Sequence, residues 1–347
     1  MNKKYNILFV LLVITYCTLS LCLVINKVSY SSNNIESCNN TNNNMIGDFG
    51  QINKDIKFFD VSDFAQASPN TIDIASKVYS NNVISIADSN FKISDELLSN
   101  IYSTIQSYGS SSSFYLISLT DGMSIAYNID RGYETASSIK APYALYIYEE
   151  MDKGNINGDS LITYEQRFYN KGTGVVKKSD FGTSFSVRDL VYYSLYESDN
   201  VAHTMLHGNY GVNGYNNFLR NLGTKQLYLT AANPWGFTSA RSAALIWQEI
   251  YNFSIRSELG IEFLNILSTA KYNYFKEVMP DIPSAGKAGF ASYDVVETGI
   301  VFDEKPYIGV AIANRGGNIG AYSQVLKLIS YMNDIMKEYY IYLETIS

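Results

Sequence analysis

Ser137-Ser138-Ile139-Lys140 opens a segment whose pattern predicts a helix from residue 137 to about residue 152, just before Gly154. Residues three apart lie on one face of a helix, so the amine of Lys140 can reach the hydroxyl of Ser137. A serine becomes a good nucleophile when a neighbouring base takes its proton. Burial beside other cations lowers the pKa of a lysine and lets it be that base. Taken alone, the tetrad equally suits a capping serine next to a surface lysine.

Ser198-Asp199-Asn200 forms a second motif inside LVYYSLYESDNVAHTML, on an expected turn between two helical segments. A buried Ser198 at such a turn can pass protons, and a buried Asn200 can hold an amide oxygen. The same three residue types also suit a helix cap or an ordinary turn. The motif therefore indicates a site only in combination with others.

Lys287-Ala288-Gly289 forms a third motif, directly before a β-type run. A lysine on a strand can bind a substrate carboxylate and, as a second cation, lower the pKa of Lys140. Gly289 has no side chain, so the backbone there can approach a ligand closely. A solvated lysine on an edge strand is the simpler alternative.

The hydrophobic pattern predicts, in chain order, a helix, a hairpin, a group of helices, a second hairpin and a final helix. Ser94-Asp95-Glu96 marks the first helix start, and Asp121-Gly122 between two β-type runs is a hairpin signal. The expected β-type runs cover residues 114–119, 123–127, 295–302 and 307–313, and the mainly helical segments cover residues 94–105, 137–152, 186–256 and 322–340. This order predicts an α+β domain whose antiparallel sheet is built from both chain ends, with a helical lobe inserted between the strands.

The combination of S-x-x-K, S-D-N and a motif like K-T-G is the set found in class A β-lactamases and penicillin-binding proteins. Residues 93–340 therefore resemble a class A β-lactamase-type serine hydrolase domain of the penicillin-recognising serine enzymes. Four further stretches add to the resemblance, at residues 182–190, 216–223, 238–241 and 297–301. The resemblance implies a β-lactamase/transpeptidase-like fold, with a five-stranded antiparallel sheet flanked by helices and an inserted all-helical lobe.

The resemblance also implies roles for individual residues. Ser137 would be acylated, Lys140 would be its base partner, and Ser198 would pass a proton to the leaving amide nitrogen. Four residues would bind substrate: Asn200, Lys287, Gly289 and Phe290. Lys287 would supply positive charge to a substrate carboxylate, and the backbone N–H groups of Ser137 and Phe290 would form the oxyanion hole.

Two departures from the family pattern bear on turnover. In class A β-lactamases a glutamate of the omega loop activates the water that hydrolyses the acyl-enzyme. Residues 224–240, TKQLYLTAANPWGFTSA, contain no Asp or Glu, and a structural role fits Glu249 in the helix that follows. Because general acid–base help is typically worth about 10²–10⁴-fold, we expect slow deacylation. Ala288 stands where the family usually has Thr or Ser, which should weaken contact with a β-lactam carboxylate.

Composition and histidine spacing restrict the cofactors and partners. The net charge is −7, and no dense basic patch is present, so we expect no nucleic-acid partner. His203 and His207 are four residues apart and could ligate zinc, but no HExxH motif or third ligand accompanies them. Packing or capping roles fit the two histidines better. We therefore expect no metal and no cofactor.

The start of the chain predicts membrane attachment. Lys3 and Lys4 precede the uncharged residues 7–25, which are long enough to cross a hydrocarbon layer as one helix. Positive charge before the span predicts a single-pass protein of the cell membrane with its remainder outside the cytoplasm. A cleavable signal peptide, and hence secretion, is the alternative.

Three regions follow from this interpretation. We assign residues 1–27 to a signal anchor, residues 28–92 to a polar stalk and linker, and residues 93–347 to the enzyme domain. Residues 51–90 also allow a second interpretation, as a small extension packed on the domain. The domain has no cysteine, which suits an exported bacterial protein that relies on its core rather than on disulfides.

The features together favour a monomeric serine acyl-transfer hydrolase acting on β-lactams or on D-Ala-D-Ala-like peptidoglycan stem peptides. The fold does not choose between a β-lactamase with another route to water activation and a penicillin-binding D,D-peptidase-type enzyme. A third alternative is a non-catalytic cell-surface module that binds peptidoglycan or a protein. Ala288 and the acid-free loop motivate this alternative, whereas the complete set of polar motif residues opposes it.

Overall fold

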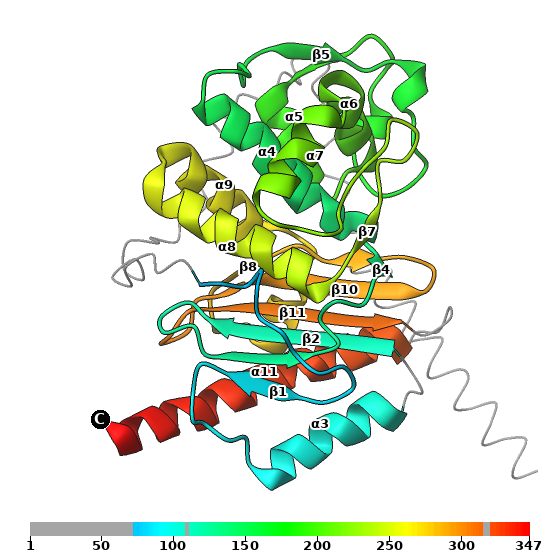
Figure 1. The fold of residues 1–347 in the computed structure, drawn as a ribbon. Helices are drawn as coiled ribbons and strands as arrows, with labels where there is room; N and C mark the ends of the chain where they lie inside the picture. The colour runs from blue at the N-terminus through cyan, green and yellow to red at the C-terminus, as the bar shows by residue number, and fades with distance from the viewer. Residues whose placement is uncertain (1–71, 108–110, 315–319) are drawn as a thin grey trace, which may run out of the picture. The chain divides into compact units, whose positions relative to one another are not determined.

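The computed structural model describes residues 72–107, 111–314 and 320–347, all within one compact unit. Its elements form the predicted α+β architecture, an antiparallel sheet with helices on both faces (Figure 1). The strands of the sheet are β1 (Ser85–Ala87), β2 (Ser111–Ser118), β3 (Ser124–Tyr127), β8 (Ser284–Gly286), β9 (Gly289–Phe290), β10 (Asp294–Val301) and β11 (Tyr307–Asn314).

Every neighbouring pair in this sheet is antiparallel, in the order β1-β3-β2-β11-β10-β8, and the short β9 also pairs with β10. The two predicted hairpins, β2 with β3 and β10 with β11, form its centre. They meet where β2 pairs with β11, with Ser118 opposite Tyr307. The sheet is therefore built from segments on either side of residues 128–283, as the sequence predicts.

Helices cover the two faces of the sheet. Helix α8 (Ala240–Arg256) packs on one face, and α3 (Asp95–Ser107) and α11 (Gly320–Ile346) pack on the other. The alternation of side chains along β2 shows the reason, because Tyr115 and its alternate neighbours enter the core under α8 while Phe114 enters the core under α11. A strand buried on both faces has its register strongly specified.

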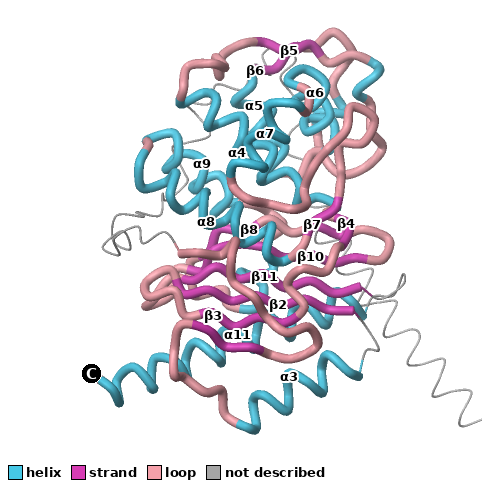
Figure 2. Tube along the Cα trace, viewed as in Figure 1, coloured by secondary structure: helices cyan, strands magenta, loops and turns pink. Residues whose placement is uncertain are grey.

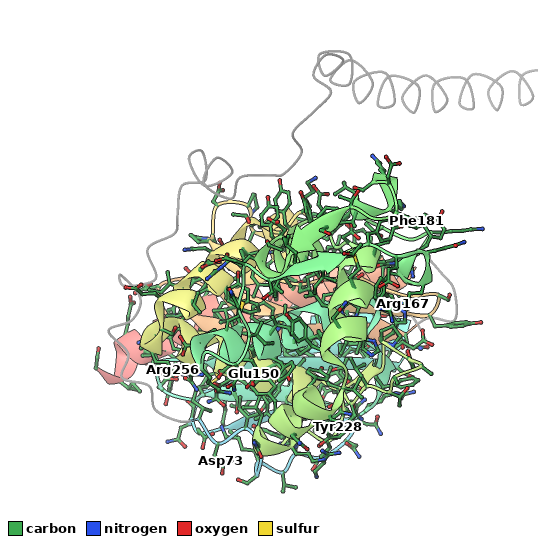
Figure 3. All side chains as sticks on the ribbon, turned by 90° about the horizontal axis from the view of Figure 1, so that it is seen from above. Asp73, Glu150, Arg167, Phe181, Tyr228 and Arg256 are labelled. Atoms are coloured by element: carbon green, nitrogen blue, oxygen red, sulfur yellow. The ribbon has the colours of Figure 1, made fainter. Side chains whose placement is uncertain are left out.

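The inserted segment folds mostly as helices, as predicted (Figure 2). Its helices are α4 (Lys140–Asp152), α5 (Val187–Tyr196), α6 (Asn200–Tyr210), α7 (Asn213–Asn221), α8, α9 (Glu258–Thr269) and α10 (Tyr274–Val278), and its short strands pair as β4 (Tyr133–Glu134) with β7 (Phe237–Thr238) and β5 (Leu161–Thr163) with β6 (Ser184–Ser186). Helix α5 starts with a capping box of Ser186 and Asp189, which satisfies N–H groups at its start. Polar and aromatic side chains such as Arg167 and Phe181 lie at the outer edge of this lobe (Figure 3).

The number of strands differs from the expected five, because the described sheet has seven. The strand around Lys287 is divided into β8 and β9, since residues 287 and 288 leave the regular ladder. The other addition is β1, which pairs with the edge strand β3. The sequence around β1 has no clear alternation, so this strand depends on contacts with the rest of the domain.

Those contacts show how residues 72–92 pack. The carbonyl oxygen of Ile72 accepts a hydrogen bond from Gln248 Nε2 at 2.9 Å, and that of Ile74 accepts one from Arg241 Nη1 at 2.7 Å. Both donors lie on α8. In the described part of the chain, residues 72–74 therefore lie against α8.

The predicted anchor at residues 7–25 and most of the predicted stalk lie outside the described residues. Within the described part of the chain, no helix combines the length and the apolar character needed to cross a membrane, and this includes the long α11.

Candidate active site

Ser137 lies on a 3-10 turn, Ala136–Ile139, that leads directly into α4. The α-helix therefore begins at Lys140 and not at Ser137, which corrects the predicted helix start. Ala136 has φ +45°, a left-handed conformation that costs energy for a residue with a side chain. Such strain gathers at functional sites, and here it sets the direction in which the chain presents Ser137.

Lys140 is the centre of the polar contacts at the site. Its Nζ donates to Ser137 Oγ at 2.8 Å and to Asn200 Oδ1 at 2.7 Å. It also lies 2.7 Å from the carbonyl oxygen of Ser198 and 3.1 Å from Ser198 Oγ. The side chain has no exposed surface. The predicted reach of Lys140 to Ser137 is therefore present, and the first two motifs meet at one amine.

Lys287 brings the third motif to the same place. Its Nζ donates to Ser198 Oγ at 3.0 Å and to the carbonyl oxygen of Ala288 at 3.2 Å. The Ser198 hydroxyl thus lies between two buried amines, those of Lys140 and Lys287. This position allows Ser198 to exchange protons with Lys140, as the resemblance implies.

Burial is the largest cause of the lowered pKa of both lysines. Burial lowers the pKa of Lys140 well below its usual value, and the charge of Lys287 lowers it further. Burial also lowers the pKa of Lys287 to about 8. A buried lysine with a lowered pKa can be neutral at physiological pH, which a general base must be.

The Ser198 turn is held by the residue that follows it. Asp199 is fully buried, and its carboxylate accepts the backbone N–H groups of Val175, Val176, Val201 and Ala202 at 2.5–3.0 Å. Asp199 thereby caps α6 and ties its start to the loop at residues 175–176. Ser198 itself has φ +54°. The cap provides the surrounding structure that keeps this strained residue pointing at Lys140.

A cleft of about 450 Å³ opens beside Ser137. Its described lining residues are Glu134, Ala136, Ser137, Gly172, Thr173, Asn200, Asn233, Trp235, Gly236, Phe237, Phe290, Ala291 and Ser292. Asn200 Nδ2 also donates to Asn170 Oδ1 at 3.2 Å, which orients the Asn200 amide at the cleft wall. Lys287 is buried behind Ser198 and is not among the lining residues, so its contact with a substrate carboxylate stays a prediction.

Strand β9, with Gly289 and Phe290, lies against the turn that carries Ser137. A side chain at Gly289 would lie 2.3 Å from the Thr135 carbonyl oxygen and 3.2 Å from the Ser137 nitrogen, so only glycine lets β9 approach the nucleophile turn. The Phe290 side chain is 60% exposed and lines the cleft. The proximity of β9 to Ser137 is compatible with an oxyanion hole from the Ser137 and Phe290 N–H groups, which stays a prediction.

Glu297 is a buried residue that the sequence analysis did not assign to the site. Its carboxylate on β10 accepts the N–H of Tyr274 at 2.7 Å and that of Thr298 at 3.2 Å. Burial raises the pKa of Glu297 to about 8, and its charge raises the pKa of Lys287. Glu297 thus influences the site through Lys287. The sequence signal that could have identified Glu297 is an acidic residue within a β-type run.

The loop at residues 224–239 supplies the remaining wall, and it places Trp235 over Lys140. The indole centroid is 5.4 Å from Lys140 Nζ. His203 and His207 face this loop, where their Nε2 atoms contact the carbonyl oxygens of Pro234 and Thr230 at 2.8 and 3.1 Å. Within the described chain no three His, Cys, Asp or Glu side chains are grouped to hold a metal ion.

Sequence comparison identifies the family to which this site belongs. The sequence model described as the β-lactamase enzyme family matches residues 96–339, well over half of the chain. The chain therefore belongs to the β-lactamase enzyme family and has its serine hydrolase fold. A search of curated proteins finds no match.

Solved structures share this fold at low sequence identity. A β-lactamase from Sphaerobacter thermophilus is 19% identical with a TM-score of 0.62, and the match covers 70% of this chain and 96% of that chain. PBP-A is 17% identical with a TM-score of 0.64, over 70% and 97% of the two chains. A β-lactamase from Chitinophaga pinensis is 16% identical with a TM-score of 0.62, over 69% and 99%. Identities this low show the fold and leave the substrate to be argued from the site.

Proposed function

We propose that the protein is a serine acyl-transfer hydrolase that captures β-lactams or D-Ala-D-Ala-like peptides as an ester on Ser137 and releases them slowly. One observation carries the proposal: the fully buried Lys140 amine lies 2.8 Å from Ser137 Oγ. A buried amine with a lowered pKa, in contact with a hydroxyl at the edge of a cleft, is an arrangement suited to nucleophilic catalysis.

The contacts suggest a route for the proton during acylation. Neutral Lys140 takes the proton of Ser137 as Oγ attacks the substrate carbonyl, and backbone N–H groups stabilise the oxyanion. Lys140 then passes a proton through Ser198 to the leaving nitrogen. The C–N bond breaks and an ester to Oγ remains, so Lys140 ends neutral. Lys287 keeps positive charge beside the Ser198 hydroxyl during this transfer.

Slow release is proposed because the loop wall offers no carboxylate to activate water. Residues 224–240 contain neither Asp nor Glu, and the loop residues that line the cleft are Asn233, Trp235, Gly236 and Phe237. Glu134 is the acidic residue among the lining residues, and it lies on β4 rather than on this loop. Without a carboxylate on the loop, we expect hydrolysis of the ester to forgo the roughly 10²–10⁴-fold help of a positioned base. This favours a D,D-peptidase-like or penicillin-binding behaviour over an efficient β-lactamase.

The proposal includes a location outside the cytoplasm, on the cell membrane. It is motivated by Lys3 and Lys4 before the apolar residues 7–25. Its chemistry also fits such a place, because peptidoglycan stem peptides lie outside the membrane. Fractionation of cells that express the full chain, followed by protease treatment of intact spheroplasts, tests both the anchor and the side of the membrane. A protein protected from the protease would contradict the proposed orientation.

Penicillin G is a suitable probe, since a mutant of PBP-A has been solved as an acyl-enzyme complex with that compound. The test is the intact mass of the protein after incubation with penicillin G, for the wild type and for Ser137→Ala. We expect the mass of one penicillin to be added to the wild type and none to Ser137→Ala. No adduct on a folded wild-type protein would contradict the proposal and favour the non-catalytic binding module.

A further inference from the structure

One aromatic side chain closes the side of Lys140 that its polar partners leave open. Nζ contacts Ser137, Ser198 and Asn200, and the Trp235 ring lies 5.4 Å away. Trp235 also lines the cleft, whereas Lys140 has no exposed surface. Water from the cleft can therefore reach Lys140 only when a neighbouring group moves, and the indole is a cleft-lining group that lies over Nζ.

Two histidines hold the loop that carries this indole. A carbonyl oxygen can only accept a hydrogen bond, so the Nε2 atoms of His203 and His207 carry the protons donated to Pro234 and Thr230. The His203 ring also packs against Trp235, with 5.2 Å between ring centroids. Burial lowers the pKa of His203 to about 3, so its ring stays neutral. The two histidines therefore have a structural role, which is to hold the loop that carries Trp235.

The nucleophile turn holds the same loop from the other side. Thr135 Oγ1 donates to the carbonyl oxygen of Trp235, and the Thr135 N–H donates to that of Gly236 at 3.4 Å. Thr135 is two residues before Ser137. The position of the indole is therefore fixed relative to both Ser137 and Lys140.

We infer that Trp235 is a positioning residue that keeps water from Lys140 in the acyl-enzyme and so prolongs the life of the ester. The inference rests on the proposed function. Hydrolysis requires water to attack the ester carbon while a base takes its proton, and the ester C–O bond then breaks to free Ser137 Oγ. Lys140 is the base that contacts Ser137. With the indole in place, Lys140 serves acylation but cannot bind the attacking water.

The experiment follows the lifetime of the penicillin G adduct by intact mass after excess penicillin is removed. Trp235→Ala removes the indole, and Trp235→Phe keeps an aromatic ring against Lys140. His207→Phe removes the anchor at Thr230 and leaves Trp235 itself unchanged. Tyr228→Ala is the matched control, because Tyr228 is an aromatic residue of the same loop that contacts Arg220 and donates its hydroxyl to the Thr224 carbonyl oxygen.

We expect Trp235→Ala to shorten the adduct lifetime by at least about tenfold, which is below the full effect of a positioned base. His207→Phe should shorten it less, and Trp235→Phe and Tyr228→Ala should stay close to the wild type. Equal lifetimes for the wild type, Trp235→Ala and His207→Phe would overturn the inference while leaving the proposed function intact. If no protein in the series forms an adduct, the proposed function fails first and the inference fails with it.

Discussion

The two walls of the cleft differ in what they offer to chemistry. On the motif wall, the hydroxyls of Ser137 and Ser198 lie 2.8 and 3.1 Å from Lys140 Nζ. Lys287 is buried behind this wall, with its Nζ 3.0 Å from Ser198 Oγ. On the loop wall, residues 224–239 present an indole to Lys140 and are held through backbone carbonyl groups. Under the proposed function, the first wall supplies the groups that form an ester, and the second supplies no carboxylate to hydrolyse it. Acylation and deacylation can therefore be changed separately.

The largest effect on the motif wall is expected from Lys140→Met, which keeps the length of the side chain and removes the base. The rate of acylation by penicillin G should fall by about 10²–10⁴-fold, as measured by the growth of the adduct mass. The substitution also removes the donor to the Ser198 carbonyl oxygen and to Asn200 Oδ1, which lowers stability, so the melting temperature is measured to select conditions in which the variant is folded. Lys153→Met, at the exposed end of the same helix, is the control. A Lys140→Met protein that acylates as fast as that control would remove Lys140 from the mechanism.

A smaller effect is expected from giving the loop wall a carboxylate. Asn233 lines the cleft, so Asn233→Glu places an acid beside the ester, and Asn233→Gln places an amide of the same length there. Asn233→Glu should raise the rate of deacylation by about tenfold, below the range for a well-positioned base. The rate of acylation should be nearly unchanged in both. Equal deacylation by the two variants would show that the missing carboxylate does not limit release.

The smallest effect is expected in the pH profile of acylation. Lys140 must be neutral, so the rate should rise as the pH passes upward through its lowered pKa. Lys287 must be charged, and its pKa is about 8, so the rate should fall above that pH. The Glu297 carboxylate raises the pKa of Lys287, and Glu297→Gln should therefore move the falling limb to lower pH. A falling limb that stays in place, in a variant with an unchanged melting temperature, would exclude this influence.

Much of the fold could be predicted because its signals are local. β-type runs on either side of a turn predicted both central hairpins, and the spacing of Ser137 and Lys140 predicted their contact. Strand β1 was not predicted, because it is only three residues long and its pairing with β3 is a contact between distant segments of the chain. The division of the Lys287 strand also depends on tertiary contacts rather than on sequence pattern.

The site was predicted only where a motif was present. The sequence shows the residue types of Ser198 and Ala136, but not their positive φ angles, which the surrounding structure imposes. Trp235 lies over Lys140 from a distant loop, and Glu297 influences Lys287 from the neighbouring strand β10, so no motif connected either pair. His203 and His207 have spacing that suits a metal, yet each contacts a loop carbonyl oxygen. For these side chains, the sequence does not show which distant segment of the chain packs against them.

The difference between the walls is tested most directly by pre-steady-state kinetics of the wild-type protein with an excess of a chromogenic cephalosporin. If acylation is fast and deacylation is slow, each protein should release about one equivalent of product in a burst. A much slower steady rate should follow. The Ser137→Ala variant should show no burst. Fast linear turnover without a burst, or no reaction at Ser137, would contradict the account.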